Sequence, residues 1–192
     1  RTILRLYDVT EGSAIYTSKD ENGNLKKYDL ATLKKRNLLD LRTELQLIFQ
    51  DPYSSLSPRM TVGEIIGEAV RVHKIVPAAQ VNDYVRTIMA RCGLQPHHYD
   101  RYPHEFSGGQ RQRICIARAL SVNPKLVICD EPVSALDVSI QAQIINLLKK
   151  LQKEMNLAYV FISHDLSVVK FISDKIGVMY LGSMVEFGSK ED

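Results

Sequence analysis

Hydrophobic residues recur along the chain at two kinds of spacing, and these predict strands that alternate with helices. Runs of neighbouring apolar residues in segments 44–50, 125–131 and 157–165 predict buried strands of the kind found in parallel sheets. Apolar residues three and four positions apart predict a helical block over 61–120, and a further amphipathic helix between the last two strands. Strands that alternate with helices in this way indicate an α/β layered domain.

The segments outside this pattern predict smaller elements. Residues 1–6 have a helical pattern, and residues 12–30 predict a β-hairpin around an Asn-Gly turn. A polar helical piece follows at 31–42, and prolines and serines predict a loop over 51–60. Near the carboxyl end, 175–188 predicts two short strands that turn at a Gly-Ser pair. No internal repeat is present in this order of elements.

Composition and charge limit the classes of protein to which this chain can belong. With 192 residues, 45% of them hydrophobic, the chain can bury a core, and its length indicates one domain with room for a subdomain. The net charge of +3 is small and the basic residues are mixed with acids, which disfavours nucleic-acid binding. Three cysteines without a CxxC pair indicate a reducing compartment. No apolar run approaches the roughly 20 residues of a membrane span, so we expect any work at a membrane to be done from its surface.

Polar residues stand at the end of each of the three predicted strands. These ends are Gln50, Asp130 with Glu131, and a Ser-His-Asp sequence centred on His164. In open α/β sheets a ligand binds beyond the carboxyl ends of the strands, so we expect these side chains to meet. Asp130 is a natural anchor for Mg²⁺, and Glu131 is able to polarise a water for attack on phosphorus. His164 is placed to contact a terminal phosphate, and Gln50 to ligate the metal or hold a water.

Each of these features also has an ordinary structural interpretation. The two acids would serve equally as a solvated N-cap pair before the next helix. A single histidine is more often a satisfied polar residue, and Gln50 would then be a loop-facing amide. Only in combination do they favour one nucleotide-hydrolysing site.

The stretch EFSGGQRQR, residues 105–113, opens a predicted helix. Ser107, Gly108 and Gly109 stand where unpaired backbone N–H groups and the positive end of the helix dipole attract phosphate. The glycines allow close approach, and the serine hydroxyl adds a donor. A serine N-cap with a flexible lead-in is the alternative, and this stretch alone does not decide between the two.

Five short motifs follow one another along the chain: FQDP (49–52), FSGGQRQR (106–113), LVICDE (126–131), SALD (134–137) and ISHD (162–165). With them the chain resembles the ATP-binding subunit of an ABC transporter over nearly its whole length. In that family the motifs are, in order, the Q-loop, the signature motif, the Walker B motif, the D-loop and the H-loop. Longer stretches are similar to the second (F-type) ATPase of bacterial dipeptide and oligopeptide importers, a group that includes nickel and glutathione relatives.

The resemblance implies a P-loop NTPase (RecA-like) αβα sandwich of the ABC ATPase type. Residues 1–59 and 121–192 would form its core and residues 60–120 the helical subdomain that carries the signature motif. It also implies ATP and Mg²⁺ as ligands, and ATP hydrolysis coupled to import of dipeptides or oligopeptides. The alternatives are an ABC ATPase for nickel, glutathione or another solute, and a soluble ABC ATPase that acts in DNA repair or translation.

The resemblance assigns catalytic roles to matching residues only. Gln50 would meet Mg²⁺ and the attacking water, and would couple the site to the membrane subunits. Asp130 would hold Mg²⁺, Glu131 would act as the general base, and His164 would contact the γ-phosphate.

The resemblance also implies that one ATP site needs two chains. Asp137 would bridge the interface between two ATPase subunits. Further partners would be permease subunits and, indirectly, an extracytoplasmic substrate-binding protein, with the ATPase on the cytoplasmic face of the bacterial inner membrane. The residues that would contact ATP bound to the opposite subunit are Ser107, Gly108, Gly109 and Gln110.

The phosphate-cradling loop of the family, G-x-x-x-x-G-K-[ST], does not occur in the 192 residues. Because Glu131 and His164 are intact, we interpret the chain as a piece of a longer gene product, truncated at both ends and with an incomplete amino-terminal part of the fold. Loss of that loop would remove a central strand and leave its neighbours unpaired. A non-catalytic interaction fragment is the alternative.

We expect the 192-residue chain by itself to be inactive and to bind ATP poorly, because it has no loop to hold the phosphates. A nucleotide-binding assay on this chain is the measurement. Micromolar affinity for ATP would contradict the expectation.

Overall fold

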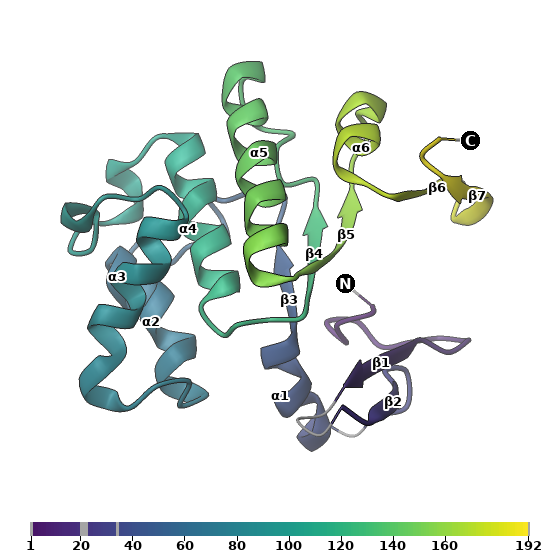
Figure 1. Cartoon of the computed structure of the whole chain (residues 1–192), viewed down its shortest axis with the longest axis horizontal. Helices are drawn as coiled ribbons and strands as arrows, with labels where there is room; N and C mark the ends of the chain where they lie inside the picture. The colour runs from purple at the N-terminus through teal and green to yellow at the C-terminus, as the bar shows by residue number, and fades with distance from the viewer. Residues whose placement is uncertain (1, 20–22, 34, 192) are drawn as a thin grey trace. The chain divides into compact units, whose positions relative to one another are not determined.

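The computed structural model describes residues 2–19, 23–33 and 35–191 (Figure 1), with only the backbone for 35–37, 39 and 40. Packing divides the chain after Leu45 into an amino-terminal unit and a larger unit that begins at Gln46. The predicted division into a core and a helical subdomain of residues 60–120 stays a prediction.

A β-hairpin and a helix make up the amino-terminal unit. Strands β1 (Ile15–Lys19) and β2 (Leu25–Asp29) pair antiparallel, and helix α1 (Lys35–Glu44) follows. Near the end of the helix, the Glu44 carboxylate accepts hydrogen bonds from Tyr16 at 2.9 Å and from Ser18 at 2.7 Å. The predicted hairpin is confirmed, although the asparagine of its Asn-Gly turn lies outside the described residues.

The helix predicted for residues 1–6 is wrong. Residues 2–5 form turns, and Arg5 has a φ of 54°, which lies in the left-handed region that a right-handed helix excludes. A segment of six residues forms few helical hydrogen bonds. These do not offset the conformational entropy that is lost when the first turn of a helix forms.

A three-stranded sheet lies at the centre of the larger unit, in the order β3-β4-β5. These strands are β3 (Leu45–Ile48), β4 (Leu126–Asp130) and β5 (Ala158–Ile162). β4 and β5 are parallel, and the three arrows in Figure 1 point the same way. All three predicted strands are therefore confirmed as strands, and their carboxyl ends lie along one edge of the sheet.

Burial differs between β4 and β5, which were both predicted to be buried strands. Val127 and Cys129 of β4 are fully buried, as expected for a central strand. On β5, however, Val160 is 41% exposed and Ile162 is 47% exposed. Their face of the strand is open to solvent, while Tyr159 on the opposite face packs against the core. The prediction of a buried strand is therefore wrong for one face of β5.

The last strands form a separate hairpin. β6 (Lys175–Tyr180) and β7 (Ser183–Ser189) pair antiparallel and turn at Leu181–Gly182. Within the described part of the chain, β6 has a strand partner only in β7, and β5 has one only in β4. A cavity of about 680 Å³ is lined by residues of β5, α6 (Leu166–Ile172) and this hairpin. Both strands therefore present an edge that no described strand covers.

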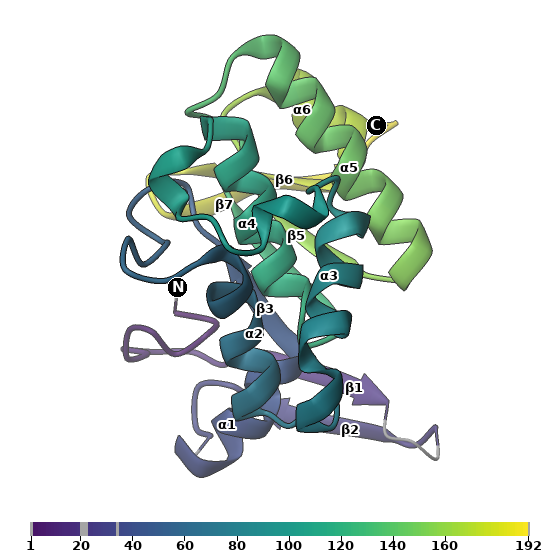
Figure 2. The same cartoon turned by 90° about the vertical axis from the view of Figure 1, so that its left-hand side faces the viewer.

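The helical block predicted over 61–120 is present, and so is the helix between β4 and β5. Thr61 and Glu64 form the capping box at the start of α2, with the Thr61 N–H donating to the Glu64 carboxylate at 2.7 Å. α2, α3 and α4 pack against one another, and α4 also contacts α5 (Figure 2). The helices are α2 (Val62–Val72), α3 (Val81–Arg91), α4 (Gly108–Leu120) and α5 (Val138–Met155), with 3₁₀ turns at Ala78–Gln80, Pro96–His98 and Pro103–Glu105.

One continuous apolar core underlies the sheet and the helices of the larger unit. It includes Ile48 of β3, Ile66 of α2, Ile116 of α4 and Leu148 of α5, each at most 1% exposed. Because this core packs the sheet against the helices, the ends of the strands and the start of α4 belong to the same packed unit. Within the part of the chain that the structure describes, no helix is both long and apolar enough to cross a membrane.

The three cysteines are buried free thiols. Because of them, the stability of the folded chain depends on pH above about pH 9. Burial raises the pKa of Cys92 and of Cys129 from 9.0 to about 12, and it also raises the pKa of Cys115. The folded chain therefore favours the neutral thiols. Their contribution to stability is complete below the ordinary thiol pKa of 9.0 and is lost as the pH rises toward about 12.

We expect urea titrations to give a free energy of unfolding that falls between about pH 9 and about pH 11. The variant Cys129→Ala serves as the comparison, because its loss of stability over this range should be smaller. An equal loss in both proteins would contradict the role of the Cys129 thiol.

Candidate functional site

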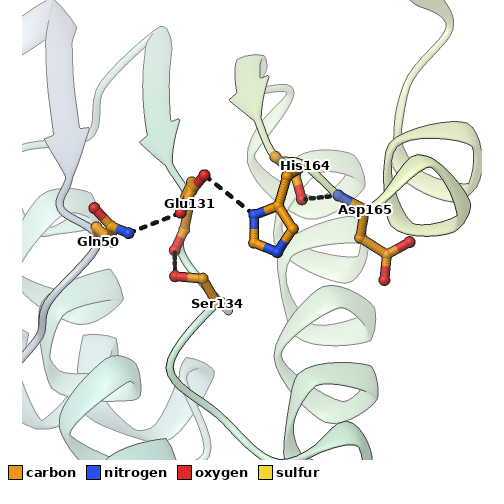
Figure 3. Close-up of polar contacts among 6 residues, drawn as sticks. Gln50, Glu131, Ser134, His164 and Asp165 are labelled. Carbon is orange, nitrogen blue, oxygen red and sulfur yellow. Dashed lines mark hydrogen bonds and ion pairs between the residues drawn. The ribbon is translucent and has the colours of Figure 1, made fainter.

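The three strand ends converge on the carboxylate of Glu131 (Figure 3). Gln50 Nε2 donates to Glu131 Oε2 at 2.7 Å. On the other side, His164 Nδ1 lies 3.2 Å from Glu131 Oε1. The expected meeting of these side chains is therefore found, with Glu131 between the other two.

The sheet explains why these residues meet. Each follows a different one of three neighbouring strands, and the Glu131 N–H donates to the Ile162 carbonyl at 3.0 Å, which extends the pairing of β4 and β5 by one residue. Glu131 follows the central strand, so the chain segments on both sides direct a polar side chain toward it. This is the edge at which open α/β sheets bind their ligands.

The backbone of Glu131 has an uncommon conformation. Its φ is 47°, in the left-handed region that non-glycine residues rarely adopt. Ser134 holds it there, because both its N–H and its hydroxyl donate to the Glu131 carbonyl, at 3.3 and 3.1 Å. Such a conformation costs of order 1 kcal/mol, and a functional site is one of the places where this cost is retained. Sequence reasoning included Ser134 in the SALD motif but gave it no role in the site, although a serine four residues after the end of a strand is a common turn residue.

The Glu131 carboxylate is the less exposed partner of the pair with His164. Its side chain is 26% exposed, whereas that of His164 is 72% exposed. Glu131 accepts from Gln50, and if the His164 ring carries its proton on Nδ1 it accepts from there as well. In that tautomer Nε2, on the far side of the ring, is an acceptor; it donates to a ligand only when both ring nitrogens carry a proton.

Asp165, next to His164, has a structural task. Its carboxylate oxygen Oδ1 accepts from the N–H groups of Ser167 at 2.8 Å and Val168 at 3.3 Å, which caps helix α6. The helix start therefore fixes the backbone just after His164.

Asp130 is the last residue of β4 and is half-buried. A carboxylate here and the amide oxygen of Gln50 are both oxygen ligands, the type that Mg²⁺ takes in small number beside water and substrate phosphates. The donor set therefore fits the predicted metal. Among the residues that the structure describes, no group of three or more His, Cys, Asp or Glu side chains could hold a metal by itself.

The start of α4 has the geometry of a capped helix. Ser107 Oγ accepts from the Gln110 N–H at 3.4 Å, and Gln110 Oε1 accepts from the Ser107 N–H at 3.1 Å. The alternative interpretation, a serine N-cap, is thus confirmed as a cap. It does not compete with anion binding, because the Ser107 hydroxyl proton and the N–H groups of Gly108 and Gly109 remain as donors.

The predicted site residues that are not at the strand ends lie around the start of α4. A Cβ atom added to Gly108 would lie 3.3 Å from Leu136, and one added to Gly109 only 2.5 Å from Ile140. Asp137 stands between these two contacts, at the N-cap of α5, and its carboxylate does not cap that helix. The structure thus brings Asp137 close to the glycines of α4, as a second set beside the one around Glu131.

Comparisons with known proteins agree with the motifs. The sequence model of the family described as "ABC transporter" matches residues 1–134. The "Oligopeptide transport ATP-binding protein OppF" of Bacillus subtilis is 50% identical over the whole chain, which covers 61% of that protein. The "Glutathione import ATP-binding protein GsiA" of Shigella flexneri is 53% identical over 99% of the chain, which covers 29% of that protein.

A solved structure has the same fold. It is a dimeric, post-hydrolysis state of the ATP-binding cassette MJ0796 bound to ADP and Pi, with a TM-score of 0.77 and 26% sequence identity. The match covers 98% of this chain and 78% of the other. The chain therefore spans most of a solved nucleotide-binding domain, but less than two thirds of the length of OppF.

Proposed function

Because the chain belongs to the ABC transporter family, we propose that it forms part of an ATP-hydrolysing subunit that powers the import of dipeptides or oligopeptides. The observation that carries the proposal is the Glu131 carboxylate, held between Gln50 and His164 at the end of the central strand. A carboxylate fixed in this way is suited to take a proton from an attacking water.

In the proposed reaction Glu131 is the general base. The water that attacks the γ-phosphorus gives a proton to Glu131, while Gln50 holds the carboxylate from one side and helps to orient the water. In its doubly protonated form His164 would donate from Nδ1 to Glu131 and from Nε2 to the γ-phosphate, where the charge of the transition state increases. Asp130, together with the Gln50 amide oxygen, would hold Mg²⁺, which when bound neutralises charge on the β- and γ-phosphate oxygens.

The start of α4 is proposed to act on a nucleotide held by a second ATPase subunit. The hydroxyl of Ser107 and the N–H groups of Gly108 and Gly109 form a donor set for phosphate oxygens at the positive end of a helix of 13 residues. Gln110 keeps Ser107 in place. Asp137, whose neighbours Leu136 and Ile140 lie against the glycines, would bridge to the partner subunit. Permease subunits at the cytoplasmic face of a bacterial membrane, and through them an extracytoplasmic binding protein, are the further proposed partners.

The nature of the solute is the finer part of the proposal. Peptides are favoured because OppF, a protein named for oligopeptide transport, aligns with the whole chain. Glutathione is the second candidate, because GsiA has a slightly higher identity.

The test uses the full-length protein, assembled with its permease subunits in liposomes. ATP hydrolysis should increase when a peptide and its binding protein are added, and glutathione should not have this effect. Stimulation by glutathione alone would favour the second candidate, and the absence of ATP hydrolysis under all conditions would contradict the proposal.

A further inference from the structure

The loop between β3 and α2 rests on one stripe of helix α4. Arg111, Cys115 and Arg118 are four and three residues apart, so they share a face of the helix. The Arg111 guanidinium lies 5.1 Å from the centre of the Tyr53 ring. Cys115 Sγ lies 3.3 Å from Ser55 Oγ, and Arg118 Nη1 donates to the Ser55 carbonyl oxygen. Three successive levels of one helix therefore hold the loop.

The held part of the loop is itself a closed turn. Asp51 accepts from the Tyr53 N–H at 2.8 Å and from the Ser54 N–H at 3.3 Å, and these hydrogen bonds keep the pKa of its carboxyl below the ordinary value. Ser55 Oγ lies 3.3 Å from the Pro52 carbonyl oxygen, to which it donates. Because these hydrogen bonds leave the turn few free torsions, we expect a displacement of Ser55 to move the start of the loop with it.

Gln50 stands at that start. Its side chain is exposed, and it reaches the Glu131 carboxylate through a single hydrogen bond of 2.7 Å. Holding an exposed side chain in one direction costs conformational entropy, and this cost is smaller when the backbone on both sides is already fixed. On one side Gln50 has strand β3, and on the other it has the turn held by α4.

We infer that Arg118 is a positioning residue for ATP hydrolysis, because its bond to the Ser55 carbonyl fixes the turn that places Gln50 against Glu131. The inference rests on the proposed function. It has a further consequence, since α4 begins at Gly108 and ends beyond Arg118. A nucleotide that displaces the start of this helix would also displace Gln50.

A double-mutant cycle on kcat tests the inference in the full-length protein assembled with its partner subunits. Gln50→Ala and Arg118→Ala should each lower kcat by roughly tenfold, with the KM for ATP changed by less than about twofold. Because Arg118 acts through Gln50, the double variant should be no slower than Gln50→Ala. Arg118→Lys, which keeps a donor, should recover part of the rate.

The matched control is Arg86, another helical arginine that donates from Nη1 to a backbone carbonyl, that of Pro96, at 3.1 Å. Arg86→Ala should leave kcat unchanged, because its partner lies outside the loop. A thermal unfolding measurement shows whether each variant is folded. If Arg118→Ala is unfolded, Arg118→Met takes its place in the cycle, since it keeps a long side chain but has no donor for the Ser55 carbonyl.

The outcomes separate the inference from the proposed function. If the double variant is slower than Gln50→Ala by the full factor of Arg118→Ala, or if Arg118→Ala has a normal kcat, the inference is overturned. If Gln50→Ala itself has a normal kcat, the proposed role of Gln50 is wrong and the inference falls with it.

Discussion

Replacing Glu131 by glutamine should abolish ATP turnover by the full-length protein with its partner subunits, while ATP binding persists. The amide keeps the size of the side chain and an oxygen that can accept from Gln50, but it cannot take a proton from water. Loss of a general base lowers kcat by about 10²- to 10⁴-fold. Phosphate release in steady state and ATP affinity by equilibrium binding are the two measurements.

The control for this variant is Glu154→Gln. Glu154 lies on α5, 46% exposed, with its nearest positive partner, Lys150, at 3.7 Å. Removing its charge should leave both hydrolysis and binding unchanged. Hydrolysis retained by Glu131→Gln would exclude Glu131 as the base, and loss of ATP binding would show that the carboxylate serves the fold or the ligand instead.

Replacing Gly109 by alanine should impair both stability and hydrolysis. The new methyl group would lie 2.5 Å from Ile140 Cγ2, a branch close to the α5 backbone that cannot easily move aside. Overpacking of this kind costs typically about 1–3 kcal/mol. It would also push the first turn of α4 away from the segment that carries Asp137, so we expect ATP hydrolysis to fall at least about tenfold.

A second substitution tests whether the clash with Ile140 causes the loss of stability in Gly109→Ala. The variant Gly109→Ala with Ile140→Ala removes the clash, so its melting temperature should return toward that of Ile140→Ala alone. Gly108→Ala is the matched comparison, because its methyl group would lie 3.3 Å from the end of the Leu136 side chain and should cost less. If Gly109→Ala is as stable as Gly108→Ala, the contact with Ile140 does not limit this position.

Local features of the chain were predictable from sequence because the residues that cause them are neighbours. The capping box of Thr61 and Glu64 needs only residues three apart, and the hairpin of β1 and β2 needs only a turn dipeptide between two strands. The meeting of Gln50, Glu131 and His164 was also predictable, since polar residues at the ends of parallel strands share one edge of the sheet.

Features that depend on distant parts of the chain were not predictable. Val160 and Ile162 have the composition of a buried strand, yet their exposure depends on whether another element covers that face of β5. The hydrogen bond from Arg118 to the Ser55 carbonyl joins residues 63 positions apart, and no sequence pattern in either segment predicts it. The roles of Gln50, Asp130, Glu131 and His164 likewise stay predictions, because hydrolysis is a property of the assembled protein.

At Glu131 the backbone conformation and the proposed chemistry favour different residues. Glycine, or asparagine, would suit a φ of 47° better, so conformational preference alone would not select glutamate there. Having glutamate instead of glycine at this position lowers the stability of the folded chain by about 1 kcal/mol. A substitution chosen at this position for stability alone would therefore be expected to discard the group that the proposed reaction needs.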